Sequence, residues 1–262
     1  MPELPDVEVY RRYFDATSLH QEISQVEIRA TELVKSTALS TLREELRGGS
    51  FEDTRRHGKW LFAGLDTGKW LVLHFGMTGD LKYFQDLEED PEHDQLLISF
   101  VNGYHLAYIA PRKLGEFRII KEVEGFLNAK ELGPDVMDLN SDQFISLLSG
   151  RRGMLKTALM DQSLMAGIGN VYSDEILYQV GLHPRTEVKV LDQQEIGEVF
   201  SVLQEVMNTV IERGAAPEDF PVDYLTPHRD PGENCPRCEG EVKRIKVSGR
   251  SSYYCPGCQE RP

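Results

Sequence analysis

Cysteine is almost absent from this chain, and the four cysteines that occur all follow residue 234. Two close pairs near one end favour a bound metal over disulfides in a reducing compartment. No apolar run approaches the about 20 residues that a membrane-spanning helix needs. The start, Met-Pro-Glu-Leu-Pro, is charged and proline-rich where a signal peptide requires apolar residues. We therefore expect a cytoplasmic protein without a membrane anchor.

Basic residues are also in the minority, with 29 Lys and Arg against 43 Asp and Glu and a net charge of -14. That balance alone argues against a nucleic-acid partner, but binding depends on the local field and not on the sum. The acidic residues concentrate in blocks at 86–94 and 131–142. The cations form four clusters, each of which alone could be an ordinary solvated face. The clusters are Arg55, Arg56 and Lys59; Arg112, Lys113, Arg118 and Lys121; Arg151, Arg152 and Lys156; and Lys243, Arg244, Lys246 and Arg250.

The 262 residues suit two modest domains and an appendage. Residues 4–15 have helical spacing, and residues 20–125 contain short apolar strands between glycine turns, which indicates a two-layered antiparallel sandwich. Helical periodicity covers 141–213, and 214–234 has the composition of a loop. The breaker cluster Leu-Gly-Pro-Asp at 132–135 marks a boundary. We predict an α+β protein with domains at 1–133, 134–225 and 226–262.

The cysteines form two CxxC pairs, Cys235 with Cys238 and Cys255 with Cys258. Four thiolates at this spacing fit the tetrahedral coordination of zinc. The residues between the pairs alternate like a β-hairpin, with Arg250 at a tip where it could meet a phosphate. No ligand position is left for water, so we expect one structural zinc ion per chain. Two disulfides or unliganded thiols are the alternatives.

The segment Ala-Gly-Ile-Gly-Asn at 166–170 precedes a helical pattern that Gly181 and Pro184 end. Asn170 is a typical N-cap, and glycines before a helix let the backbone approach an anion closely. A DNA phosphate could therefore bind at this helix N-terminus. For this segment alone, an ordinary tight turn between helices is the better interpretation.

The N-terminus offers a nucleophile. Removal of Met1 would expose Pro2, a secondary amine that is far more often neutral at pH 7 than a lysine. The N-terminal end of the following helix would favour the neutral form further. Such an amine can attack a sugar carbon and form a Schiff base, and the adjacent Glu3 can move protons. The same two residues are also a common start that permits methionine removal.

Together these segments resemble the formamidopyrimidine-DNA glycosylase family, and the resemblance runs from end to end. The matching motifs are, in chain order, Pro2-Glu3-Leu4-Pro5-Asp6-Val7-Glu8, His74-Phe75-Gly76-Met77-Thr78-Gly79, Pro111-Arg112-Lys113-Leu114-Gly115, the segment from Gly167 to Glu175, and Gly249-Arg250-Ser251-Ser252-Tyr253-Tyr254-Cys255.

The resemblance implies an N-terminal antiparallel β-sandwich and a C-terminal helix–two-turn–helix domain with a zinc-binding hairpin. It implies a bifunctional base-excision repair enzyme for damaged double-stranded DNA. As a DNA glycosylase this enzyme would remove oxidised bases such as formamidopyrimidines. As an AP lyase it would then nick the strand by β,δ-elimination through a Schiff base on Pro2. We expect a monomer, associated with the nucleoid.

The resemblance also assigns residue roles. Glu3 is the proton donor during base loss, Lys59 takes part in β-elimination, and Arg250 serves δ-elimination and phosphate binding. The expected DNA contacts are Met77 and Arg112, which fill the gap left by the flipped base, together with His93, Lys156 and Asn170.

Three positions depart from the family pattern. Asp6 replaces a glutamate, Leu114 stands where members specific for 8-oxoguanine have phenylalanine, and the segment between Arg213 and Cys235 is short for a base-capping loop. Leu114 is still expected to act as an apolar wedge. One alternative is therefore the endonuclease VIII-like branch, which prefers oxidised pyrimidines. Others are a non-catalytic zinc-containing DNA-binding protein and a zinc-ribbon interaction adaptor.

Overall fold

A computed structural model describes residues 1–259, in two compact units. One unit comprises Met1–Pro2 and Asp6–Glu131, and the other comprises Glu3–Pro5 and the chain from Leu132 onward. The helices that follow Leu132 and the zinc module belong to the same unit. Among the described residues, no helix has both the length and the apolar character needed to cross a membrane.

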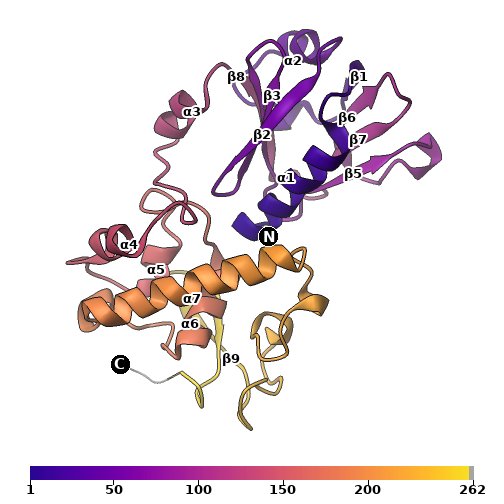
Figure 1. Cartoon of the computed structure of the whole chain (residues 1–262). Coiled ribbons are helices and arrows are strands. Elements are labelled where there is room, and N and C mark those ends of the chain that lie inside the picture. Colours follow the sequence, from indigo (N-terminus) through magenta and orange to yellow (C-terminus); the bar gives the residue numbers. More distant parts are fainter. Residues whose placement is uncertain (260–262) are drawn as a thin grey trace. The chain divides into compact units, whose positions relative to one another are not determined.

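The first unit is an antiparallel β-sandwich of two four-stranded sheets, as predicted (Figure 1). One sheet has the order β1-β6-β7-β5 and the other β2-β3-β4-β8. The strands are β1 (Ile23–Ile28), β2 (Phe51–His57), β3 (Trp60–Leu65), β4 (Trp70–His74), β5 (Asp80–Phe84), β6 (Asp94–Phe100), β7 (His105–Ile109) and β8 (Glu116–Ile120).

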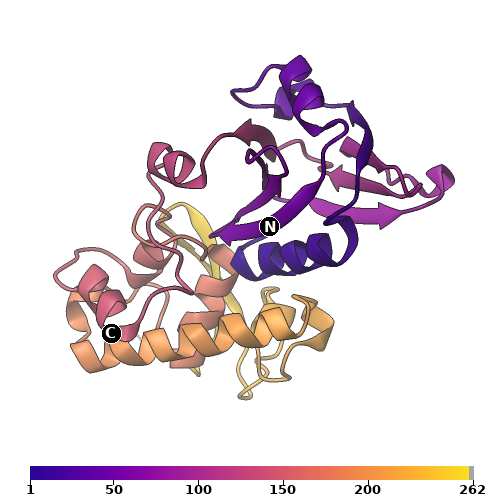
Figure 2. The ribbon, with the colours of Figure 1, turned by 45° about the horizontal axis from the view of Figure 1, so that its top comes forward.

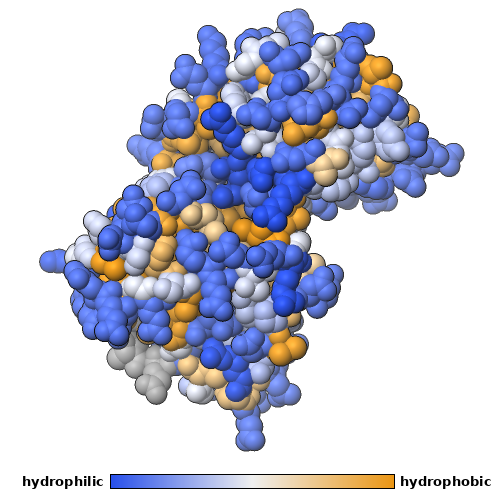
Figure 3. Space-filling view, in the orientation of Figure 1, coloured by the Kyte–Doolittle hydropathy of each residue, from blue (hydrophilic) through white to orange (hydrophobic). Residues whose placement is uncertain are grey.

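Helices and apolar strand residues close the core of this unit. The helix α1 (Leu4–Ser18) runs beneath the strands (Figure 2) and contributes Phe14, whose ring meets that of Phe51 edge-on with centroids 5.0 Å apart. It ends three residues beyond the prediction. The unit also contains α2 (Leu39–Leu46), α3 (Val123–Ala129) and the 3₁₀ turns η1 (Thr31–Leu33) and η2 (Leu87–Glu89). The predicted acidic block surrounds η2, and this edge of the sandwich is hydrophilic (Figure 3).

The second unit is helical. Its helices are α4 (Ser141–Leu148), α5 (Leu155–Leu159), α6 (Asn170–Val180) and α7 (Gln193–Glu212), with the 3₁₀ turns η3 (Val188–Val190), η4 (Pro217–Asp219) and η5 (Thr226–His228). A capping box at Asp192 and Glu195 begins α7. Its apolar stripe, which includes the buried residues Val199, Leu203, Val206 and Val210, packs against α4 and α6.

The hairpin of the zinc module consists of β9 (Lys243–Val247) and β10 (Arg250–Tyr254). Ser248 and Gly249 form the two-residue turn, with φ of 47° and 81°. Positive φ at both positions is the backbone of a type I′ turn, which suits the twist of a hairpin. Arg250 is the first residue of the returning strand, next to the turn.

Candidate functional site

The carboxylate of Glu3 binds the N-terminus of α6 within the second unit. Its Oε2 accepts the N–H groups of Gly169 at 2.7 Å and Tyr172 at 3.3 Å, and its Oε1 accepts that of Val171 at 2.8 Å. Glu3 has no exposed surface. These N–H groups have no partner inside the helix, and the helix dipole favours an anion there. The predicted phosphate site is therefore wrong, because the chain supplies its own carboxylate.

The two glycines before α6 leave space for residues 3 and 4. A β-carbon at Gly169 would overlap the carboxyl group of Glu3, and one at Gly167 would overlap the side chain of Leu4. The N–H of Leu4 also donates to the carbonyl of Gly167 at 3.1 Å. The Gly-Ile-Gly pattern thus fixes the residues that follow Pro2 in the chain.

Asn170 is the first residue of α6 and not its N-cap, which is Gly169. The N-cap prediction for Asn170 is wrong because the Glu3 carboxylate already takes the first N–H groups. Its side chain instead donates from Nδ2 to the carbonyl of Ser251 at 2.8 Å. This bond ties the start of α6 to β10.

One turn further along α6, Asp174 is fully buried and accepts bonds from four groups. It pairs with the Lys156 ammonium and with Arg229 at 2.7 Å, and it accepts the hydroxyl of Ser252 at 2.5 Å and the N–H of Tyr253 at 3.1 Å. The guanidinium of Arg229 also lies 4.8 Å from the ring centroid of Tyr253. The carboxylate therefore joins α5, α6 and β10.

Lys156, predicted to contact the DNA backbone, has no exposed surface. Burial lowers the pKa of Lys156, while the neighbouring Asp174 carboxylate acts in the opposite direction. An ammonium committed to a buried ion pair is not presented to a phosphate, so a direct DNA contact at Lys156 is not supported. The Lys156 ammonium instead balances the negative charge of the buried Asp174 carboxylate.

The four cysteines meet at one point. Their Sγ atoms all lie within 4.8 Å of one another, and the closest pairs are Cys238 with Cys255 at 3.5 Å and Cys235 with Cys258 at 3.7 Å. Four thiolates around a zinc ion at about 2.3 Å lie about 3.8 Å apart, so the set fits the metal. β-Carbons at Gly240 and Gly257 would press on these sulfurs at 3.1–3.2 Å, which explains both glycines. The cysteines hold one structural zinc ion.

Arg250 is exposed beside the turn of the hairpin. The turn rests on α5, where the hydroxyls of Thr157 and Ser248 are 2.8 Å apart and Nη1 of Arg250 lies 3.4 Å from the sulfur of Met160. The guanidinium thus contacts α5 through one nitrogen, and the residue as a whole is exposed. This arrangement suits a phosphate contact.

In the first unit, Lys59 occupies the turn between β2 and β3. Gly58 has φ of 55° there, and Arg56 donates to its carbonyl at 3.3 Å and to the carboxylate of Glu8 at 3.3 Å. Burial opposes ionisation of Glu8, but Arg11, Arg12 and Arg56 outweigh it and lower the pKa of Glu8. The ion pair between Arg56 and Glu8, together with the bond from Arg56 to Gly58, therefore fixes the turn that contains Lys59.

Met77, Arg112 and Leu114 lie on two loops that pack backbone to backbone. A β-carbon at Gly76 would come within 2.5 Å of the Leu114 carbonyl carbon, so only glycine permits this approach. All three side chains are exposed, Met77 by 39% and Leu114 by 52%. Exposed apolar side chains on tightly fixed loops are suited to enter a gap in a base stack.

His74, at the end of β4, is paired in register with Trp60, the residue after Lys59. It lines a hollow of about 400 Å³ together with Leu114 and Glu116. Burial lowers the pKa of His74 to about 4; Glu116 acts in the opposite direction, and Lys59 and Lys130 act in the same direction as burial. His74 is therefore neutral at pH 7. The motif that contains it was recognised in the sequence, but no role was assigned to the residue.

His93 is exposed in the turn before β6, with φ of 66°. Its carbonyl accepts the N–H of Ala110 at 3.0 Å, which places it beside the loop of Arg112. The structure thus gathers Lys59, Met77, His93, Arg112 and Leu114 on connected turns of the sandwich. It gathers Glu3, Asn170 and Arg250 around α6 and the hairpin of the second unit.

Sequence reasoning missed Asp174 and Arg229. Two adjacent acids, Asp174 and Glu175, inside an otherwise apolar helical stretch were a signal that could have identified the first. Arg229 carries no local signal, because its partner Asp174 lies 55 residues away in the chain.

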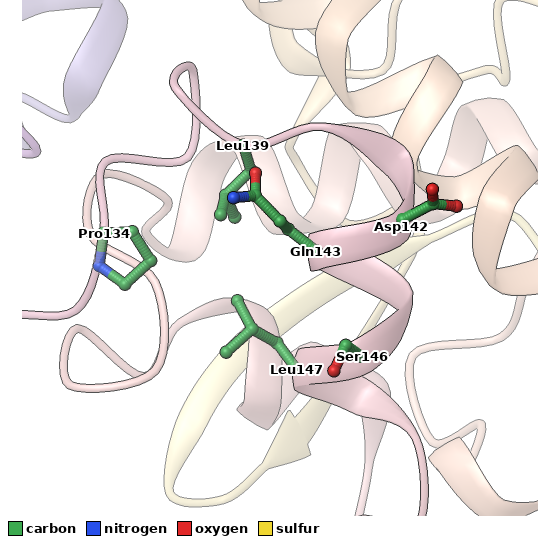
Figure 4. A pocket seen from close by; sticks show the side chains of 6 residues that line it. All are labelled: Pro134, Leu139, Asp142, Gln143, Ser146 and Leu147. Carbon is green, nitrogen blue, oxygen red and sulfur yellow. The ribbon is translucent and has the colours of Figure 1, made fainter.

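A separate hollow of about 460 Å³ lies beside α4 and the loop before it (Figure 4). Its lining is Pro134, Leu139, Asp142, Gln143, Ser146 and Leu147. It contains no cation and no predicted site residue, so it is not a candidate for binding a polyanion.

Three family models match the chain in succession. They are the formamidopyrimidine-DNA glycosylase N-terminal domain at residues 1–117, the H2TH domain of the same enzymes at 132–220, and a zinc finger found in FPG and IleRS at 232–261.

Full-length relatives agree with these models. The chain is 31% identical to a formamidopyrimidine-DNA glycosylase of Pelotomaculum thermopropionicum over 99% of both chains, and 33% identical to one of Streptococcus pyogenes over 100% of this chain and 99% of the other. It is also similar to two crystal structures of the Lactococcus lactis enzyme, each 28% identical and covering 99% of this chain and 100% of the other. One is bound to DNA containing an AP site, with a TM-score of 0.88, and one to DNA containing N7-benzyl-Fapy-dG, with a TM-score of 0.89.

Proposed function

The chain belongs to the formamidopyrimidine-DNA glycosylase family, and we propose from this how its own residues carry out the reaction. It is a DNA glycosylase that acts on damaged DNA and holds one structural zinc ion, and membership implies AP lyase activity. We propose that it removes oxidised bases and then nicks the strand by β,δ-elimination through Pro2. Chromosomal DNA as the substrate would place it in the cytoplasm, at the nucleoid.

The observation that carries the proposal is the binding of Glu3 to the N-terminus of α6. This contact fixes the residue next to Pro2 by three hydrogen bonds. A nucleophile that must reach one sugar carbon benefits from such pre-organisation, because orientation can supply several kcal/mol of a barrier, about 7–11 in favourable cases. Gly167 and Gly169 leave the space that the side chains of Leu4 and Glu3 occupy.

In the proposed reaction, the neutral amine of Pro2 attacks C1′ of the damaged nucleotide. The bond between C1′ and the base breaks, and the base leaves with a proton. The proton of the Pro2 amine is then lost, O4′ accepts a proton, and the C1′–O4′ bond of the sugar ring opens, which gives an iminium between Pro2 and C1′. Glu3 is the group next to Pro2 that can transfer the proton. Removal of Met1 is required, because the lone pair of an amide nitrogen at Pro2 would be delocalised into the Met1 carbonyl and would not act as a nucleophile.

The iminium acidifies the neighbouring carbon of the sugar, so that a base can remove its proton. The bond from C3′ to its phosphate oxygen then breaks, and the 5′ phosphate follows in the second elimination. We assign Lys59 to the first step and Arg250, as a phosphate ligand, to the second.

Base access requires that the nucleotide leave the duplex, which costs a few kcal/mol. We propose that the exposed Met77 and Leu114 enter the vacated stack and that Arg112 donates to the unpaired base opposite. Asn170, Arg250 and His93 would contact the backbone, with salt-dependent affinity.

The test is strand nicking and borohydride trapping on duplexes with one oxidised base or one abasic site. We expect a nick and a covalent protein–DNA adduct from protein that begins at Pro2. Protein that retains Met1 should give neither. Binding without nicking would leave the non-catalytic alternative, and trapping with Met1 in place would exclude Pro2 as the nucleophile.

A further inference from the structure

Three polar residues one turn apart form a stripe along α6 that faces the zinc module. Positions four residues apart lie on the same face of a helix. Asn170 donates to the carbonyl of Ser251, Asp174 accepts from β10, and the hydroxyl of Tyr178 lies 3.1 Å from the sulfur of Cys235. The stripe therefore holds the hairpin at its tip and the metal site at its base.

Asp174 is the charged member in the middle of this stripe. Its two oxygens bind two different parts of β10, since Oδ1 accepts the Ser252 hydroxyl and Oδ2 accepts the N–H of Tyr253. These residues follow Arg250 by two and three positions. Ser252 has no exposed surface, so no water replaces its bond to the carboxylate.

The charges around Asp174 require a carboxylate at this position. The same two oxygens pair with Lys156 and Arg229, both of which also donate to the carbonyl of Asn170, at 3.4 Å and 3.3 Å. Removing one member of a buried ion pair leaves an uncompensated charge. An amide at this position would direct its NH₂ group at one cation or at the N–H of Tyr253.

We propose that Asp174 is a positioning residue for the DNA-binding side chains of this unit. Asp174 fixes β10, so that Arg250 can contact a DNA phosphate. It also fixes Lys156 and Arg229, which donate to the carbonyl of Asn170. Asp174 itself touches no DNA. The inference rests on the proposed function only in the roles given to Arg250 and Asn170.

The first test needs no DNA. Amide hydrogen exchange of zinc-loaded protein is compared between wild type and Asp174→Asn. We expect protection of the amides of residues 251–254 to fall at least tenfold while zinc content stays at one per chain. Asp192→Asn is the matched control, because Asn caps a helix as well as Asp. Unchanged protection in β10 would overturn the proposal.

The second test uses an abasic duplex, which bypasses base excision. Asp174→Asn should lower the fraction of δ-product relative to β-product at least tenfold. The slope of log Kd against log salt should fall by about two, one for each lost phosphate contact. A general loss of folded protein would reduce both products together and leave their ratio unchanged, which would contradict the positioning role.

Ser252→Ala provides a second variant in case Asp174→Asn does not fold. It removes one bond to the hairpin and leaves both ion pairs of Asp174 in place. We expect the same changes in exchange and product ratio, about threefold in size, and no change in either would reject the proposal. If wild-type protein nicks no damaged or abasic duplex, the proposed function fails, while the exchange result still decides the role of Asp174.

Discussion

Oε2 of Glu3 accepts the N–H of Gly169 at 2.7 Å, and the space at Gly169 admits no β-carbon. The two residues are 166 positions apart in the chain. Gly169 has φ of -126°, which any residue can adopt, so the glycine is required for space and not for backbone conformation.

Replacing Gly169 therefore tests the placement of Glu3 without backbone strain. We expect Gly169→Ala to reduce single-turnover base excision by about 10²-fold, the scale for a displacement of about 1 Å in an active site. Gly125→Ala is the control, because its β-carbon would meet nothing within 4 Å. Zinc content should be unchanged in both variants. Normal excision by Gly169→Ala would show that the contact does not serve catalysis.

Glu3 and Lys59 should have separable roles. Glu3→Gln keeps the size of the side chain but removes its proton transfer, so excision should fall by about 10²-fold or more. Cleavage of a ready-made abasic site should suffer less. Lys59→Ala should weaken DNA binding and excision yet still allow borohydride trapping at abasic sites. Equal losses for both variants on both substrates would remove the basis for assigning separate roles.

The sequence could predict features that depend on local chain geometry. The turn at Ser248 and Gly249, the end of α6 at Gly181 and the cysteine cluster follow from spacing and from residues that tolerate positive φ. The apolar stripe of α7 follows from helical periodicity. The turn, the helix end and the stripe depend on neighbours within a few residues, and the meeting of the two cysteine pairs follows from the hairpin between them.

Contacts between distant segments could not be predicted in the same way. The anion at the start of α6 was expected to be a phosphate, because the pattern of glycines does not reveal that Glu3 reaches it. The resemblance implies a DNA contact for Lys156, whereas the partner Asp174 makes burial of the Lys156 ammonium tolerable. Both contacts bury a charged side chain against a segment that is distant in the chain.

His74 should make stability depend on pH. The unfolded chain takes up a proton near pH 6.5, whereas the folded protein does so only near pH 4. Proton uptake therefore favours the unfolded state as the pH falls through this window. Between pH 7.5 and pH 5, the free energy of unfolding should drop by about 2 kcal/mol from this group.

The measurement is urea unfolding of wild type and His74→Gln at both pH values. The variant should lose about 2 kcal/mol less than wild type over the same interval, whatever its absolute stability. Other groups titrate in both proteins and cancel in the comparison. An identical loss would mean that His74 becomes protonated in the folded protein near its ordinary pKa.

Zinc removal should weaken DNA binding through Arg250. Two of the four clustered cysteines, Cys235 and Cys255, lie in the buried cluster at the base of the hairpin, with Tyr178 and Val242, and metal binding in such modules is also folding energy. Loss of one charge-assisted phosphate bond should lower affinity by about 10- to 100-fold. Fluorescence anisotropy with a labelled duplex, before and after chelation with zinc measured in parallel, provides the test. Affinity that survives complete loss of zinc would separate the metal from the DNA contact.

The segment 214–234 limits how the enzyme can recognise a flipped base. Glu175 accepts the N–H groups of Leu225 at 3.1 Å and Thr226 at 2.7 Å, and burial raises the pKa of Glu175. Phe220 and Tyr224 are buried in the helical core. The exposed part between these anchors centres on Val222, which is 91% exposed. A segment bound at so many points has little backbone left to close over a base.

We therefore predict a preference for lesions that need little recognition. 8-Oxoguanine differs from guanine by one oxygen and one proton, so selecting it requires hydrogen bonds around the extruded base. Ring-opened purines, hydantoins, oxidised pyrimidines and abasic sites pair or stack poorly and cost less to extrude. They should be processed faster than 8-oxoguanine. Leu114 offers no aromatic wedge, so discrimination between different opposite bases should depend on Arg112. Arg112→Ala should therefore reduce this discrimination between opposite bases. Single-turnover excision on duplexes that differ only in the lesion decides the order. If 8-oxoguanine opposite cytosine is cut fastest, a segment other than 214–234 must cover the base.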